Sequence, residues 1–192
     1  MINHIRHMMQ STLDEKLNTN KIIITAEISP PKGVNTSAAL EDALILKGLV
    51  DALNITDNQR AVMRMSPLAL GKLLLSEGHE VIMQMTCRDR TRLAIQSDIL
   101  GAAALGIQNI CLMSGDYTTN GDHPGAKPVY DLDSVQLLSI AQKMKNGFDF
   151  SGNELEGAPE LVVGAVSNTD PSQPMQMMKL EKKVKMGAQF IQ

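Results

Sequence analysis

The strongest constraint on the fold is a regular alternation of short apolar runs with longer helix-like segments. The first run, residues 22–28, is rich in isoleucine and threonine, as a buried parallel strand should be. Similar runs occupy residues 52–56, 81–86, 107–113, 161–166 and 188–191. Helical patterns separate them; one has Ser66 and Pro67 at its start and Gly78 at its end, as helix termini prefer. This alternation predicts a parallel sheet.

Two architectures are compatible with the alternation, an open doubly wound sheet and a (β/α)₈ barrel. No G-x-G-x-x-G motif follows the first strand, so the dinucleotide fingerprint is missing. Polar residues instead follow several strands, at Glu27, Thr56, Thr86 and Asp116, as in a barrel whose site is gathered at one face. We therefore expect a (β/α)₈ TIM barrel over residues 21–192, after a lead-in of residues 1–20. Because a full barrel needs about 250 residues, we expect truncation after the start of strand six.

Composition argues against several functional classes. With three Phe, two Tyr, no Trp and a formal net charge of −3, neither stacking platforms nor a basic nucleic-acid face is predicted. No apolar stretch reaches the ~18 residues of a membrane span, and residues 1–17 lack a signal-peptide core. Cys87 and Cys111 lie in strand-like runs, which favours reduced core thiols and a cytoplasmic location. The sequence lacks the paired Cys/His spacing that would predict a metal site.

Two carboxylates are candidates for chemistry. Glu27 lies near the end of an apolar strand, where burial is costly unless the group is paired or protonated, and a protonated carboxyl would suit a general acid. The alternative is a rim carboxylate paired with Lys32 or with an arginine. Asp116 follows Gly115, which lets the backbone approach a ligand while the carboxylate points into the mouth of the fold. The alternative is a turn or cap aspartate.

A basic cluster and a histidine are further candidates for binding. Lys179, Lys182 and Lys183 have the spacing of one helix face, and they could hold a phosphate or form a solvated basic surface. His123, within an acidic loop, favours a solvated segment over a metal site, since further ligands at suitable spacing are missing.

Several segments together resemble the methylenetetrahydrofolate reductase family. They are residues 26–33 (AEISPPKG), 85–90 (MTCRDR), 101–107 (GAAALGI), 114–116 (SGD), 121–124 (GDHP), 131–134 (DLDS) and 180–188 (LEKKVKMGA). Each segment is short, but their order and spacing across residues 21–192 are specific.

The resemblance implies a flavoprotein oxidoreductase of one-carbon metabolism and methionine biosynthesis that reduces 5,10-methylenetetrahydrofolate to 5-methyltetrahydrofolate. Glu27 falls on the family's general acid, Asp116 on the aspartate near the flavin and pterin, and Thr56 near the flavin ring and the folate. The other implied cofactor contacts are Gln84, Ser114, Gly115, Tyr130, Asp131, Ala165, Asn168, Asp170, Lys179, Lys182 and Lys183. The implied cofactor is FAD, with NADH or NADPH as electron donor.

Four positions depart from better-known bacterial members, which carry His at Gln84, Arg at Ser114, Tyr at Val166 and His at Asp170. These departures leave FMN open as an alternative to FAD. The glutamine that holds folate in the family is expected just past Gln192, and a homo-oligomer or a complex with a partner subunit is expected. Two rival functions are a non-redox folate or corrinoid methyl-transfer barrel, which needs no flavin, and a non-catalytic folate-binding partner subunit.

Overall fold

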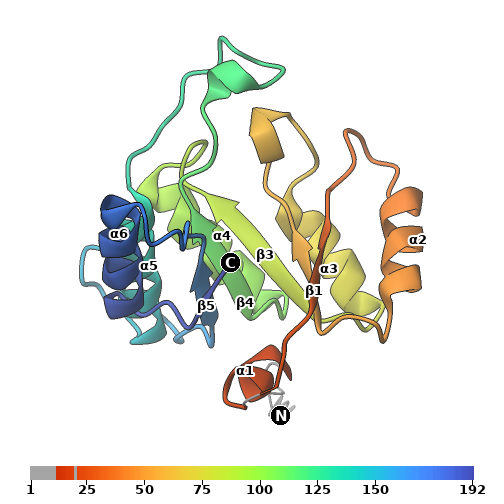
Figure 1. Ribbon diagram of the computed structural model, residues 1–192, viewed down its shortest axis with the longest axis horizontal. Helices are drawn as coiled ribbons and strands as arrows, with labels where there is room; N and C mark the ends of the chain where they lie inside the picture. Colours follow the sequence, from red (N-terminus) through yellow and green to blue (C-terminus); the bar gives the residue numbers. More distant parts are fainter. Residues whose placement is uncertain (1–11, 20) are drawn as a thin grey trace.

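The computed structural model describes residues 12–19 and 21–192 and contains one parallel sheet of six strands. The strands are β1 (Thr25–Ile28), β2 (Ala52–Ile55), β3 (Val81–Thr86), β4 (Asn109–Met113), β5 (Val162–Ala165) and β6 (Phe190–Ile191). They lie side by side in chain order, and each neighbouring pair is parallel. A doubly wound sheet reverses its strand order at a switch point. This sheet does not, and it curls into a half-barrel (Figure 1).

Helices connect successive strands and cover the outer face of the curled sheet (Figure 1). They are α2 (Ser37–Leu46), α3 (Pro67–Ser76), α4 (Arg92–Ala104), α5 (Ser134–Lys145) and α6 (Pro174–Lys185), with short 3₁₀ turns η1 (Gln59–Ala61) and η2 (Thr118–Asn120) in the loops after β2 and β4. The predicted start of α3 is confirmed, since the Ser66 hydroxyl accepts a hydrogen bond from the Leu68 amide. A capping box of Asp133 and Gln136 begins α5.

Two apolar clusters lie on the two faces of the sheet. The larger one fills the space between the sheet and the helices, with Leu53, Met83, Leu112 and Val163 pointing outward from neighbouring strands. The smaller one lies on the inner, concave face. Its members are Leu13, Ala52, Ile82 and Cys111, with Phe190 packed against them.

The inner cluster is closed from below by α1 (Thr12–Leu17), which lies beyond the amino ends of the strands (Figure 1). Its Leu13 is 2% exposed and packs among residues of β2, β3 and β4. The helix falls within the predicted lead-in of residues 1–20, of which 1–11 and 20 lie outside the described residues. The described part of that lead-in therefore covers the half-barrel at the amino ends of its strands.

The structure differs from the sequence-based prediction in the extent of the first strand and in which residues of two helices are buried. Residues 22–24 are not part of β1, and Ile22 is 88% exposed, because β1 is an edge strand whose partner β2 begins only at Ala52. Helical periodicity in the sequence predicts that Leu44 of α2 and Leu93 of α4 lie on the apolar side of their helices, but both are exposed. The small Ala39 and Ala43 are the buried residues of α2.

Candidate active site

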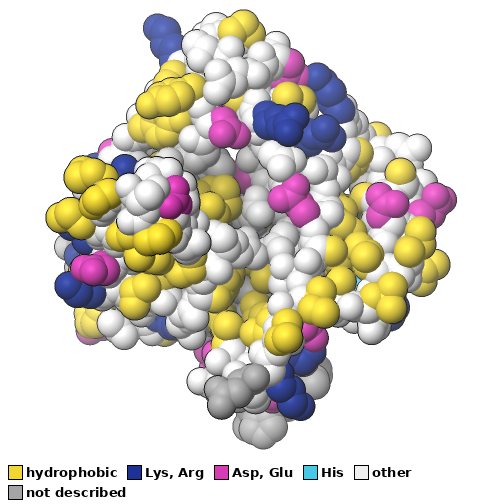
Figure 2. Space-filling model, in the orientation of Figure 1, with side chains coloured by type: hydrophobic (Ala, Val, Ile, Leu, Met, Phe, Trp, Pro, Cys, Tyr) yellow, Lys and Arg dark blue, Asp and Glu magenta, His cyan; other side chains and the backbone are white. Residues whose placement is uncertain are grey.

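The loops that follow the carboxyl ends of the strands meet above the concave face. Figure 2 shows this side of the molecule as a central hollow with acidic side chains at its rim. Strand register places Glu27 opposite Asn54, Asn54 opposite Ile82 and Gln84 opposite Cys111, so all of these residues face the hollow. Polar residues at this end of a parallel sheet are where barrel chemistry is located.

Glu27 stands exposed on the edge strand β1, and its Oε1 accepts a hydrogen bond of 2.9 Å from Nε2 of Gln59. The apolar strand predicted a buried carboxylate, but Glu27 is exposed. Its partner is also different from the one considered from sequence, because Lys32 forms an ion pair with Asp122 instead.

Asp116 follows β4 and is held by the residue next to Gln59. Its Oδ2 accepts a hydrogen bond of 2.9 Å from the backbone amide of Arg60. Gly115, immediately before it, has φ of +86°, and a Cβ there would lie 3.0 Å from the Thr86 side chain. Both facts require glycine at this position. The structure thus brings Glu27 and Asp116 to adjacent residues of one turn.

That turn has an unusual backbone. Asn58, Arg60 and Ala61 all have positive φ, at 44°, 56° and 58°. Asparagine tolerates this region, but arginine and alanine do so at a cost of about 1–2 kcal/mol each. Residues are kept in such conformations only when their surroundings fix them, and they concentrate at functional sites.

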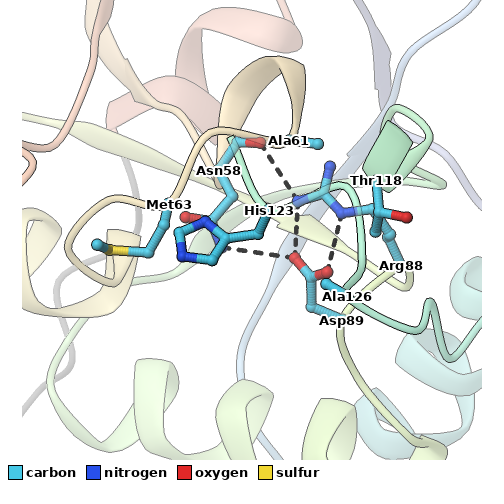
Figure 3. A pocket seen from close by; sticks show the side chains of 8 residues that line it. All are labelled: Asn58, Ala61, Met63, Arg88, Asp89, Thr118, His123 and Ala126. Carbon is cyan, nitrogen blue, oxygen red and sulfur yellow. Dashed lines mark hydrogen bonds and ion pairs between the residues drawn. The ribbon is translucent and has the colours of Figure 1, made fainter. Parts of the chain in front are cut away.

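Arg88 is the principal group that fixes the turn. Its guanidinium is 2% exposed and donates hydrogen bonds to the carbonyl oxygens of Asn58 (3.2 Å) and Asp116 (3.1 Å), which join the loops after β2 and β4. A two-pronged ion pair with Asp89, at 2.6 and 2.9 Å, neutralises it. This pairing holds the pKa of Asp89 below its ordinary value. Figure 3 shows Asn58 and Asp89 meeting Arg88 from two different loops.

Asp122 makes a second connection between loops. It accepts hydrogen bonds from Lys32 of the loop after β1, from the Met63 amide (3.0 Å), and from the ring of His123 (2.8 Å). The hydrogen bond from Lys32, followed by that from His123, holds the pKa of this exposed carboxyl well below its usual range. A Cβ at Gly121 would overlap the backbone carbonyl of Ala61, so the loop after β4 packs directly on the strained turn.

A pocket of about 210 Å³ lies beside the strained turn (Figure 3). It is lined by Asn58, Ala61, Met63, Arg88, Asp89, Thr118, His123 and Ala126. Within the described residues, no group of three His, Cys, Asp or Glu side chains could hold a metal ion. His123 therefore has no metal-site partners there.

The predicted contacts on strands two to four lie at the concave face or its rim. Thr56 is buried and donates a hydrogen bond of 3.2 Å to the Ser29 hydroxyl. Gln84 points inward and is partly buried. Ser114 is partly buried, and its carbonyl oxygen accepts the Arg88 amide at 3.1 Å.

Tyr130 and Asp131 already have protein partners. The Tyr130 hydroxyl donates to the carbonyl oxygens of Gly115 and Asp116, both at 3.3 Å, and its φ is 40°. Asp131 accepts three hydrogen bonds from the side chain and amide of Arg92, at 2.6 to 2.9 Å. The Arg92 side chain lowers the pKa of Asp131 to about 2.

The predicted contacts after strand five differ in accessibility. Ala165 is 0% exposed, and its side chain packs in the outer core between the sheet and the helices, so only its backbone faces the hollow. Asn168 and Asp170 are exposed and form a local turn, in which Asn168 accepts the Asp170 amide at 2.9 Å. Asp170 in turn accepts the Ser172 amide before α6.

The three lysines of α6 that were predicted to bind the cofactor, Lys179, Lys182 and Lys183, do not form one solvated face. Lys183 is 9% exposed, and its ammonium donates a hydrogen bond of 2.5 Å to the Val166 carbonyl at the end of β5. Burial, and then the charge of neighbouring Lys179, lower the pKa of Lys183. Lys179 and Lys182 are exposed, and none of the three lysines has an ion-pair partner among the described residues.

Three residues that shape this site were not identified from sequence, namely Gln59, Arg88 and Asp122. Arg88 and Asp122 belong to segments that resemble the family, but their roles depend on contacts between loops up to 90 positions apart. The buried free thiols Cys87 and Cys111 do agree with the prediction from sequence. Burial raises the pKa of Cys111 to about 12, which leaves the thiol unreactive.

Comparison with known proteins identifies the family and supports the fold. The family described as methylenetetrahydrofolate reductase matches residues 12–192. A solved Clostridium thermocellum protein, described as uncharacterized and as binding two copies of 5-methyl-5,6,7,8-tetrahydrofolic acid, has a TM-score of 0.61 at 16% identity. The alignment covers 94% of this chain and 58% of that one.

A second similar structure is 2,3-dimethylmalate lyase, a PEP mutase/isocitrate lyase superfamily member, with a TM-score of 0.57 at 12% identity over 94% of this chain and 60% of that one. These identities establish likeness of fold alone. The chain thus spans about three fifths of the length of the structures it resembles. No curated protein matches the sequence. No helix among residues 12–19 and 21–192 is long and apolar enough to cross a membrane.

Proposed function

We propose that this chain, which belongs to the methylenetetrahydrofolate reductase family, carries the catalytic half of a flavin-dependent reductase that converts 5,10-methylenetetrahydrofolate to 5-methyltetrahydrofolate. The observation that carries the proposal is the placement of Glu27 and Asp116. The two carboxylates come from β1 and from the loop after β4, and consecutive residues of one turn hold them over the same hollow.

Two carboxylates so placed can perform complementary tasks. Glu27 is exposed to the hollow, where its carboxyl group can donate a proton to a bridge nitrogen of the bound folate as the C–N bond opens. Asp116 keeps one oxygen on the Arg60 amide and can offer the other to donor groups of a pterin. Glu27 thus acts as general acid, and Asp116 orients the substrate.

The lysines of α6 support a flavin nucleotide. The flavin supplies the hydride that the folate receives. Lys179 and Lys183 lie close enough for the charge of one to lower the pKa of the other, and no carboxylate pairs with either among the described residues. Two ammonium groups without ion-pair partners among the described residues, of which Lys183 lies at the end of β5, favour a bound phosphate. The phosphate is common to FMN and FAD, and we propose FAD with NADH or NADPH as donor.

The proposed complete fold is a (β/α)₈ barrel. The chain-order winding of six strands is that of a barrel wall, and β1 and β6 each have one unpaired edge in the described sheet. Two further strands between these edges would close the wall over the hollow.

A second candidate function is folate binding or methyl transfer without a redox step. The solved protein that binds 5-methyl-5,6,7,8-tetrahydrofolic acid favours it, because that protein shares this fold. The two candidate functions differ in their need for flavin, because methyl transfer from a folate does not require it.

An absorption spectrum separates the two candidates. Purified protein should show a flavin band that bleaches on anaerobic reduction and returns when methylenetetrahydrofolate is added. A protein that neither carries nor takes up flavin, yet binds 5-methyltetrahydrofolate, would contradict the reductase and favour the second candidate.

A further inference from the structure

We propose that the turn of residues 58–61 is a clamp that sets the positions of both carboxylates, and that Gln59 is the positioning residue for Glu27. The inference rests on the proposed function and extends it to residues that touch no substrate. It begins from the two hydrogen bonds of 2.9 Å that reach Glu27 and Asp116 from Gln59 and Arg60.

The clamp uses two kinds of donor. Gln59 reaches Glu27 with its side-chain amide, so this bond depends on the identity of the residue. Arg60 reaches Asp116 with its backbone amide, so that bond depends on the conformation of the turn. The two carboxylates are therefore coupled, because any rotation of the turn moves both donors together.

The positive φ values of Arg60 and Ala61 set the directions in which the amide groups of this turn point. An unstrained turn would point successive amide groups in different directions from those observed. Three contacts oppose relaxation: Arg88 binds the Asn58 carbonyl, the Arg64 amide binds the Asn58 side chain at 2.9 Å, and the Met63 amide binds Asp122.

Edge-strand geometry explains why Glu27 needs such a partner. Glu27 is exposed, and β1 has a strand neighbour on one side only in the described sheet. An exposed glutamate samples several rotamers, and only those that point into the hollow can reach a substrate. The Gln59 amide restricts this freedom and keeps Oε1 on the concave side of the sheet.

The test compares Gln59→Leu with Asn120→Leu, which removes an exposed amide from the neighbouring turn η2 that holds neither carboxylate. With flavin-loaded protein, Gln59→Leu should lower kcat for folate reduction about ten- to a hundredfold, because the acid loses its orientation. The KM for the folate should change less than threefold by our estimate, since the binding groups remain. Asn120→Leu should leave both constants near their wild-type values.

A double-variant cycle identifies the residue through which Gln59 acts. In a Glu27→Gln background, Gln59→Leu should lower kcat by less than about twofold, because the group that it positions is already absent. Equal effects in both backgrounds would overturn the proposal, as would a loss confined to KM.

A spectroscopic readout keeps failure of the clamp distinct from failure of the reductase assignment. In protein labelled with ¹³C at glutamate carboxyl carbons, Gln59→Leu should move the Glu27 resonance at fixed pH, whereas Asn120→Leu should not. If the protein reduces no folate but this resonance moves, the clamp stands and the reductase assignment fails. If the protein is a reductase and the resonance stays, the clamp is wrong.

Discussion

Gln192 donates a hydrogen bond of 2.6 Å to Oδ1 of Asn54, a residue 138 positions earlier in the chain. Asn54 makes a second hydrogen bond, in which its Nδ2 donates to the Thr25 hydroxyl at 2.9 Å. A chain of amides thus runs across the concave face from the end of β6 to β2 and β1. Three strands separate β6 from β2 in the sheet, so this contact exists only because the sheet curls.

Asn54→Ala should therefore weaken the curl. The side chain is 6% exposed, and its removal leaves Gln192 and Thr25 without their partner. We expect a loss of about 1–3 kcal/mol in the free energy of unfolding, measured by urea titration. Asn120→Ala, at an exposed position, is the control. Equal losses in the two variants would show that the cross-sheet contact contributes nothing.

Glu27→Gln should retain the flavin and slow folate reduction. The amide keeps the shape of the carboxyl group but has no acidic proton, so we expect kcat to fall about 10²- to 10⁴-fold. Flavin absorbance after gel filtration and single-turnover reoxidation by the folate measure the two properties separately. Loss of flavin from this variant would make Glu27 a structural residue and would contradict its proposed role.

The fold was more predictable than the site, for physical reasons. Strand β3 agrees with the predicted residues 81–86 because both of its faces are covered and its residues are apolar apart from Gln84 and Thr86. Strand β1 is shorter than predicted, because its length is set by pairing with β2 and not by its own isoleucines. Burial of α2 and α4 differs from the prediction at Leu44 and Leu93, since the orientation of a helix depends on the sheet beneath it.

The candidate site was predictable only where the proposed function depends on residue type. Glu27 and Asp116 could be selected as candidates because the carboxyl ends of barrel strands are where catalytic side chains are gathered. Gln59 could not, because it carries no chemistry of its own and its role requires the positive φ of the residues that follow it. Arg88 adjoins Asp89 in sequence, which looks like a surface ion pair, but three loops bury its guanidinium.

Gly121→Ala should disturb the clamp without touching either carboxylate. The added Cβ would overlap the Ala61 carbonyl, so the strained turn must shift. We expect kcat to fall by at least about tenfold, because displacements near 1 Å are sufficient for such losses. Gly125→Ala is the matched control, since a Cβ at Gly125 meets nothing within 4 Å. Wild-type turnover in Gly121→Ala would show that the two loops move independently.

Asp131→Asn should lower stability at neutral pH, and the difference from wild type should vanish in acid. Arg92 lowers the folded-state pKa of Asp131 from 3.8 to about 2. A lowered pKa means that the ion pair contributes fully above the unfolded-state value and is lost as pH falls toward the folded-state value. Urea midpoints of the two proteins should therefore converge between about pH 4 and pH 2. A difference that persists unchanged at pH 2 would assign the effect to hydrogen-bond geometry alone.

The lysines of α6 predict a pH dependence of phosphate binding. Burial and the charge of Lys179 lower the pKa of Lys183 from 10.5, so Lys183 loses its proton at a lower pH than an exposed lysine does. Because an anion binds the protonated form, affinity for FMN should fall as the pH rises and should begin to fall below 10.5. Fluorescence quenching of the added flavin measures the affinity at each pH.

The Lys179→Ala variant tests whether these lysines cause the pH dependence of FMN binding. The change removes one cation, so affinity for FMN at pH 7 should fall by about fivefold or more, which is the value of one exposed charge contact near 1 kcal/mol. It also removes the repulsion that lowers the pKa of Lys183, so the remaining affinity should persist to higher pH than in the wild type. Lys182→Ala is the control, because Lys182 is not among the groups that shift the pKa of Lys183. If Lys182→Ala and Lys179→Ala weaken binding equally and neither moves the pH profile, the lysines form a solvated basic surface, and the phosphate lies elsewhere.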